Sequence, residues 1–161
     1  MRSPLLLVLF FAWFPGLCRA TSGCPWINQA TALGALGTRE DLPGASAETG
    51  PASCYFAYHD GKTTRELRIT VEDAAVPERA WMAAMKTQCG ARRMVLRAIG
   101  NEAIMCWTGR YGTGARVLGR VRDKIFTIDI KTSEEKASEM SEEILAEKAR
   151  LVAEQVSGNL F

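Results

Sequence analysis

The stretch Lys124-Ile125-Phe126-Thr127-Ile128-Asp129-Ile130 decides the fold, because apolar and polar residues alternate over most of its length. Successive side chains of a β-strand point to opposite faces of the sheet, so Phe126, Ile128 and Ile130 share one face. Thr127 and Asp129 share the other. A strand of this kind buries one side only, and the rest of the chain has to supply its neighbouring strands and the helices that cover it.

Five further segments have the apolar or aromatic content of strands. Residues 54–58 and 66–71 flank the turn sequence His59-Asp60-Gly61-Lys62, and together they form a predicted β-hairpin. Apolar and polar residues alternate in the second of these segments, which gives the hairpin one buried face. The remaining strands are predicted at residues 94–98, 103–107 and 115–121.

Three helices are predicted from apolar residues at the helical period. The first spans residues 25–37, with a proline at its start and a glycine at its end. The second spans residues 77–89 and places Trp81, Met85 and Cys89 on one face. The third spans residues 141–156, and its charged side is expected to lie in water. Residues 38–53 are rich in Gly, Pro, Ala, Ser and Thr, so we expect an exposed loop there.

This order of elements predicts an α+β domain with an antiparallel sheet of about five to six strands packed by helices. We expect residues 21–161 to form this single domain, because about 140 residues fit one domain of ordinary size.

Residues 1–20 have the parts of a secretory signal peptide. Arg2 is positively charged, residues 5–14 are continuously apolar, and Cys18-Arg19-Ala20 places small residues before a cut after Ala20. The apolar run is too short to anchor the chain in a membrane, and no later segment has the length of a transmembrane helix. The mature chain is therefore expected to be secreted or periplasmic.

A lipid anchor at Cys24 is the alternative to free secretion. Ser22 and Gly23 suit a lipoprotein cleavage site, but Thr21 replaces the usual aliphatic residue and Arg19 separates the site from the apolar run.

The mature chain is neutral overall. Loss of Arg2 and Arg19 reduces the 20 basic residues to 18, which equals the 18 acidic residues. A nucleic-acid-binding protein normally carries a basic excess, so no nucleic-acid partner is expected.

Four cysteines remain in the mature chain, namely Cys24, Cys54, Cys89 and Cys106, and an even number in an exported chain indicates disulfides. Three pairings are possible. The order along the chain favours Cys24 with Cys54 and Cys89 with Cys106, because each pair joins the end of a predicted helix to a nearby predicted strand. The sequence has no Cys-x-x-Cys pair and no histidine at zinc-site spacing, so neither a metal nor a cofactor is expected.

His59 is the only histidine of the chain, so every mechanism that needs an imidazole depends on it. Its position beside Asp60 and Gly61 predicts an exposed turn residue. The alternative is an exported hydrolase or thiol-dependent enzyme in which His59 acts with a serine or a cysteine. No catalytic residue is assigned from the sequence.

The candidate ligand-binding residues are Tyr58, Trp107, Arg120 and Arg122. Arg120 and Arg122 are separated by one residue, so a strand would project both from the same face, where they could bind an anion. The site is expected on the concave side of the sheet beneath the helices. The alternative is that the aromatic residues belong to the core and that the arginines face water or pair with carboxylates.

The order of motifs resembles that of small bacterial envelope proteins and lipoproteins of unknown function. The matching residues are Cys24, Leu36 and Gly37 around the first helix, Cys54 and Phe56 in the next strand, the turn Ile99-Gly100-Asn101-Glu102-Ala103, and residues 152–156 of the last helix. The resemblance implies an extracytoplasmic α+β domain and supplies no catalytic residues. Because the one histidine lies in a predicted turn and the sequence has neither metal-site spacing nor a nucleotide-binding loop, we expect an exported, non-enzymatic binding or interaction module of the bacterial envelope. Its partner is expected to be a small ligand or an envelope protein.

Overall fold

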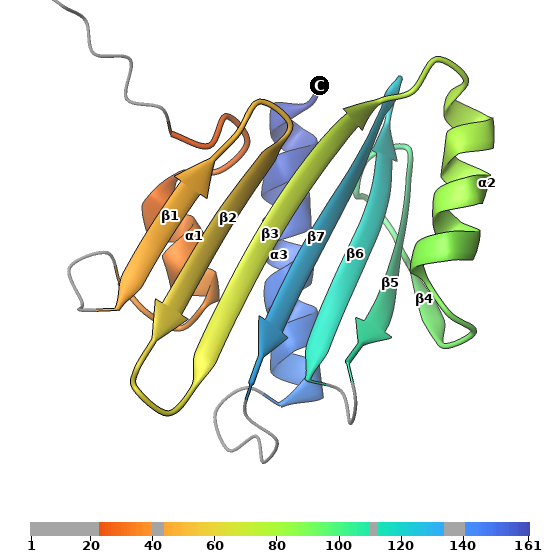
Figure 1. The fold of residues 1–161 in the computed structure, drawn as a ribbon. Helices are drawn as coiled ribbons and strands as arrows, with labels where there is room; N and C mark the ends of the chain where they lie inside the picture. The colour runs from red at the N-terminus through yellow and green to blue at the C-terminus, as the bar shows by residue number, and fades with distance from the viewer. Residues whose placement is uncertain (1–22, 40–43, 110–112, 134–140) are drawn as a thin grey trace, which may run out of the picture.

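A computed structural model of the chain describes residues 23–39, 44–109, 113–133 and 141–161. Its centre is one sheet of seven strands in the order β1-β2-β3-β7-β6-β5-β4, and every neighbouring pair is antiparallel (Figure 1). The elements in chain order are α1 (Gln29–Ala35), β1 (Ala45–Thr49), β2 (Ser53–His59), β3 (Thr64–Asp73), α2 (Pro77–Gln88), β4 (Arg93–Leu96), β5 (Glu102–Thr108), β6 (Gly114–Val121), β7 (Lys124–Thr132) and α3 (Glu142–Asn159).

The predicted α+β class is confirmed, but the sheet has seven strands where five to six were predicted. The additional strand is β1, which lies within the segment that was predicted to be a loop. Its residues are small or polar, and most of them are exposed, so they show no alternation that a sequence pattern could detect. Only its pairing with β2, from Ala45 opposite Tyr58 to Thr49 opposite Cys54, makes it a strand.

Helices α1 and α3 cover one face of the sheet and close the main core. Figure 1 shows both helices behind the strands. The alternation predicted for residues 124–130 is confirmed on this side, since Phe126, Ile128 and Ile130 are fully buried. Burial of one such side chain stabilises the fold by about 1.5–3 kcal/mol. From α3 the core receives Leu145, Ala149, Val152, Ala153 and Val156.

Helix α1 begins later than the first predicted helix. Asn28 caps its first turn, because the side-chain oxygen of Asn28 accepts a hydrogen bond of 2.8 Å from the amide of Thr31. Trp26 and Ile27 precede the helix and are nevertheless buried in the core. At the other end of the chain, α3 continues to Asn159, beyond the predicted end at residue 156.

Helix α2 lies on the opposite face of the sheet. Trp81 and Cys89 pack there in a second apolar cluster with Ile104, Cys106, Leu118 and Ile125. The helix contacts β6 and β7, and Figure 1 shows it beside the β5 and β4 end of the sheet. It does not extend over β2 and β3, so none of the helices that the structure describes covers this half of the face.

Two disulfides join the helices to the sheet, in the pairing that the sequence order favours. Cys24, before α1, is bonded to Cys54 in β2, with 5.7 Å between the Cα atoms. Cys89, at the end of α2, is bonded to Cys106 in β5, with 5.6 Å between the Cα atoms. Both separations are ordinary for disulfides.

Residues 1–20, the predicted signal peptide, lie outside the described residues. Among the helices that the structure describes, none is both long enough and apolar enough to cross a membrane.

Candidate functional site

A row of polar side chains crosses the half of this face that α2 does not cover. The strand register places Tyr55 of β2 opposite Arg68 of β3, Arg68 opposite Asp129 of β7, and Asp129 opposite Arg116 of β6. Each of these residues lies between core residues along its own strand, so its side chain projects from the face opposite α1 and α3. Four residues from four different strands therefore stand side by side.

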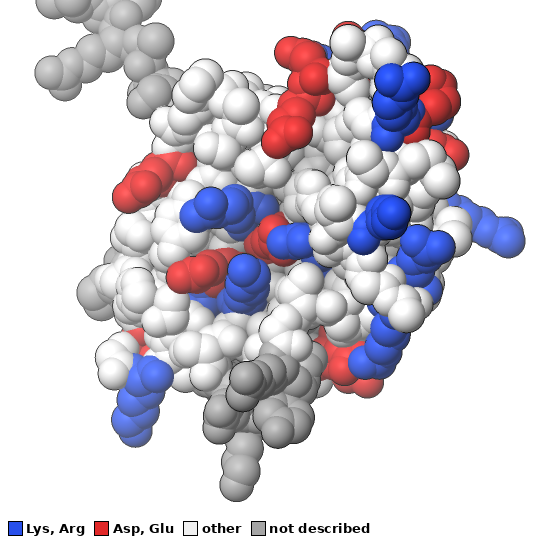
Figure 2. All heavy atoms as spheres, turned by 45° about the vertical axis from the view of Figure 1, so that its right-hand side comes forward, with Lys and Arg blue, Asp and Glu red and all other residues white. Residues whose placement is uncertain are grey.

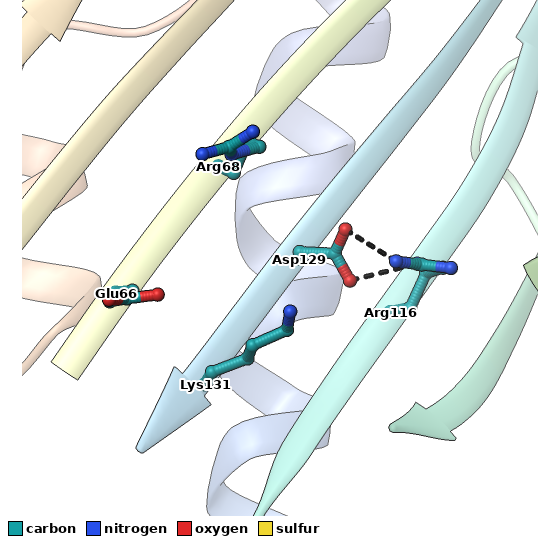
Figure 3. Close-up of a pocket in the computed structure, with 5 residues that line it drawn as sticks. All are labelled: Glu66, Arg68, Arg116, Asp129 and Lys131. Carbon is teal, nitrogen blue, oxygen red and sulfur yellow. Dashed lines mark hydrogen bonds and ion pairs between the residues drawn. The ribbon is translucent and has the colours of Figure 1, made fainter. Parts of the chain in front are cut away.

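A second, shorter row lies next to the first and completes a pocket. It pairs Glu66 of β3 with Lys131 of β7. Together with Arg68, Arg116 and Asp129, these residues line a hollow of about 320 Å³, which we call the charged pocket (Figure 3). Figure 2 shows basic and acidic side chains gathered on this part of the face within a mostly uncharged surface. Three basic and two acidic groups give the pocket a formal charge of +1.

Arg116 and Asp129 form the fixed wall of the charged pocket. The Nε and Nη2 atoms of Arg116 each donate a hydrogen bond of 2.8 Å to one carboxylate oxygen of Asp129. The Nη1 atom of Arg116 donates to the backbone carbonyl of Gln88 at 3.0 Å, at the end of α2. The side chains of Arg116 and Asp129 are only 21% and 13% exposed. A bidentate ion pair that is largely shielded from water holds both side chains in one orientation.

Arg68 and Lys131 form the free side of the charged pocket. Neither makes an ion pair with a carboxylate of the described residues. The guanidinium of Arg68 lies 5.5 Å from the ring centre of Tyr55, an arrangement that orients the group but leaves its N–H donors available. Figure 3 shows the Lys131 ammonium group directed toward the carboxylate of Asp129, and the Arg68 guanidinium over the neighbouring strand β3. These two cations are therefore the groups that can bind an anion in the charged pocket.

Tyr55 connects the free side of the pocket to Glu66. Burial is the main reason that the pKa of Tyr55 is raised, and the hydrogen bond with the Glu66 carboxylate raises it further. Both causes favour the protonated phenol, which can act as a hydrogen-bond donor toward the Glu66 carboxylate. Glu66 lines the charged pocket, where its carboxylate can accept a hydrogen bond from a ligand.

The structure does not bring the four predicted ligand-binding residues together. By the strand alternation, Tyr58 and Trp107 lie on the face that α1 and α3 cover, and three strands separate β2 from β5. Trp107 is partly buried, and the guanidinium of Arg92 lies 4.4 Å from the centre of its ring. Their role in binding a ligand stays a prediction.

Arg120 and Arg122 have different environments. Arg120 projects from the α2 side and forms ion pairs with Glu78 of α2 at 3.2 Å and Glu102 of β5 at 3.1 Å. It thus ties the helix to the sheet, as the alternative interpretation of the sequence expected. Arg122 lies in the turn between β6 and β7, at a φ of 54°, with its guanidinium 5.6 Å from the ring centre of Phe161.

His59 is exposed at the end of β2, where the sequence predicts a turn residue. Its Nδ1 atom lies 2.9 Å from the hydroxyl of Thr64. The neighbouring carboxylate of Asp60 accepts hydrogen bonds from the amides of Lys62 and Thr63 and from the Thr63 hydroxyl. Asp60 therefore stabilises the turn and does not orient the His59 ring. A thiol partner for His59 is also missing among the described residues, because all four of their cysteines are bonded in disulfides.

Metal-binding geometry is absent from the part of the chain that the structure describes, where no three His, Cys, Asp or Glu side chains converge. Comparisons of the chain with protein-family models, with curated proteins and with solved structures found no match.

Proposed function

We propose that the protein is an exported, non-enzymatic binding module of the bacterial envelope, and that it holds a small carboxylate ligand in the charged pocket. The observation that carries this proposal is that Arg68 and Lys131 form no ion pair with another described residue, while the adjacent Arg116 and Asp129 are bonded to each other. Because Asp129 is already bonded to Arg116, it only partly neutralises the Arg68 and Lys131 cations. A carboxylate placed between them gains charge-assisted hydrogen bonds.

The second feature of the ligand follows from Glu66 and from the size of the pocket. Glu66 offers an acceptor at the rim, so the preferred ligand carries an amino or hydroxyl group near its carboxylate. A hollow of about 320 Å³ is at the small end of ligand pockets. Amino acids, hydroxy acids and short peptide ends have this size and this combination of groups.

Binding without catalysis fits the lining of the pocket. Its five residues include no serine, cysteine or histidine, and the Asp129 carboxylate is already bonded to Arg116. The alternative, an enzyme that uses His59, lacks a free thiol among the described residues and lacks an acid that orients the imidazole. Titration of thiols in the native protein tests it, because one reactive cysteine would favour the enzyme.

Export is supported by the two disulfides, since such bonds persist in oxidising compartments. The bond to Cys54 also uses the sulfur that a lipid anchor on Cys24 would need. We therefore favour the freely secreted or periplasmic form of the protein. Mass analysis of protein from its natural compartment would show cleavage after Ala20 and two disulfides.

The ligand proposal is tested by NMR titration with acetate, glycolate, glycine and glycylglycine. We expect the last three to bind more tightly than acetate, and to shift the amide signals of β3 and β7. Arg68→Met and Lys131→Met should each weaken binding by about tenfold, the usual effect of losing a charge-assisted hydrogen bond. Lys62→Met removes an exposed turn lysine outside the pocket and serves as the control. The proposal would be overturned if none of the four compounds bound, or if Arg68→Met and Lys131→Met bound them as tightly as the wild type does.

A further inference from the structure

A second surface, separate from the charged pocket, combines basic and apolar side chains between α2 and β4. A hollow of about 560 Å³ is lined there by Arg79, Met82, Ala83, Met85, Lys86 and Arg93, which we call the α2–β4 surface. Residues 79, 82, 83 and 86 follow the helical spacing, so they share one side of α2. Arg93 faces them from the edge strand of the sheet.

The charges of the α2–β4 surface have one sign. Its lining contains three basic residues and no acidic one. None of the three forms an ion pair with another described residue, and the nearby Glu78 is engaged by Arg120. Figure 2 shows basic side chains over this side of the molecule. The surface is thus complementary to a negatively charged partner.

Part of the apolar lining of the α2–β4 surface is exposed and is not covered by any other described residue. Met82 is 62% exposed, and Val95 of β4, on the same face as Arg93, is 73% exposed. Methionine and arginine are both enriched in the cores of protein interfaces, and flexible methionines adapt to different apolar side chains. This composition distinguishes the surface from an ordinary solvated helix face.

The platform beneath the α2–β4 surface is rigid. Trp81 anchors α2 in the second apolar cluster with 5% exposure. The disulfide from Cys89 to Cys106 fixes the end of the helix, and Arg120 ties its first turn to β5. Binding at this surface therefore requires little ordering of the helix, which lowers the entropic cost of association.

We propose that the α2–β4 surface docks an acidic segment of a partner protein that carries apolar side chains. Carboxylates of the segment pair with Arg79, Lys86 and Arg93, and its apolar side chains cover Met82 and Met85. An open surface cannot enclose a small molecule on most sides, as small-ligand sites do. A hollow lined by residues of one helix and one strand is also narrower than the broad, protruding apolar face that membrane binding needs.

The test measures fluorescence anisotropy of a labelled peptide of glutamates interrupted by leucines. A leucine-free polyglutamate of the same length serves as the comparison. We expect the leucine-containing peptide to bind more tightly, and its affinity to fall as salt screens the charges. Met82→Ser should weaken binding by about tenfold, and Lys86→Ser by about threefold.

Matched controls remove the same kinds of side chain elsewhere. Leu151 is 55% exposed on α3, so Leu151→Ser tests the loss of an exposed apolar residue, and Lys62→Ser tests the loss of a charge. Neither should change the affinity. Equal effects of the surface variants and the controls, or no binding of the peptide, would overturn the proposal. Sedimentation with phosphatidylglycerol vesicles that depends on Met82 and Lys86 would also overturn it, in favour of a lipid surface. The charged pocket is intact in all these variants, so small-ligand binding reports on it separately.

Discussion

Arg116 donates a hydrogen bond of 2.8 Å to each carboxylate oxygen of Asp129. Arg68 lies directly opposite Asp129 on the other neighbouring strand and forms no ion pair with it. One carboxylate thus lies between two guanidinium groups in a single row, and only Arg116 is bonded to it. The bonded arginine serves the stability of the fold, and the other one remains available. The two arginines should therefore respond differently to substitution.

Arg116→Met should lower the free energy of unfolding by about 1–3 kcal/mol, because it leaves the largely buried Asp129 without its partner. Arg68→Met should change stability by less than about 0.5 kcal/mol, because the Arg68 side chain is exposed. Urea denaturation of the purified variants measures both effects. Lys124→Met is the control for an exposed ion pair, since its partner Asp73 is 79% exposed, and it should cost less than about 1 kcal/mol. Equal losses for Arg116→Met and Arg68→Met would contradict the division of roles.

Gly119→Ala should destabilise the protein by about 3 kcal/mol. A Cβ atom at Gly119 would lie 2.2 Å from the ring of Phe126, its partner on β7, and the buried ring has no room to move away. Thermal and urea unfolding of the variant provide the measurement.

Gly158→Ala is the matched control for that substitution. Gly158 lies near the end of α3, and a Cβ atom there meets nothing within 4 Å. Alanine has the higher helix propensity, so this variant should be more stable by about 0.5 kcal/mol. A loss of stability similar to that of Gly119→Ala would show that packing against Phe126 is not the cause.

Asp60 should make the stability contributed by the β2–β3 turn depend on pH. Hydrogen bonds from the Thr63 hydroxyl and from the Thr63 and Lys62 amides lower its pKa from 3.8 to about 2. A carboxyl with a lowered pKa in the folded state stabilises the fold above its unfolded pKa, and this contribution is lost as the pH falls through the folded value. The difference in Tm between the wild type and Asp60→Asn should therefore be larger at about pH 6 than at about pH 2. A difference that stays constant over this range would show that the charge of Asp60 has no part in it.

The disulfides should leave no reactive thiol among Cys24, Cys54, Cys89 and Cys106. A thiol reagent should detect none of the four cysteines, either in the native protein or in denaturant without reductant. The double substitution of Cys89→Ser and Cys106→Ser should lower the free energy of unfolding by about 3 kcal/mol, as expected from the closure of a loop of this length. Urea denaturation in parallel with the wild type checks the second expectation, and an unchanged midpoint would refute it.

The sequence predicts those strands and helices whose apolar residues recur at the period of a strand or a helix. Phe126, Ile128 and Ile130 identify β7 without any knowledge of its neighbours, and Trp81 with Cys89 identifies the buried side of α2. Strand β1 has no such pattern, since it lies at the edge of the sheet and contributes backbone hydrogen bonds with few buried side chains. Its existence depends on β2, so a local pattern could not reveal it.

The charged pocket escapes prediction for a different reason. Arg68, Arg116 and Asp129 occupy the polar positions of three amphipathic strands, where a charged residue normally faces water. They meet because β7 pairs with both β3 and β6, a register that the strands' own sequences do not specify. The alternation of polar positions in residues 66–71 and 124–130 is the only signal, and it predicts the face but not the neighbours.

The pleat of β7 also has an evolutionary consequence. Ile128 and Ile130 face the helices, while Asp129 and Lys131 face the pocket, so a substitution at an odd position of this strand need not affect the packing at an even one. Under the proposed function, substitutions at Glu66, Arg68 and Lys131 would change the preferred ligand and leave the packed interior undisturbed. Descendants of such a scaffold can diverge in specificity while they retain the same architecture.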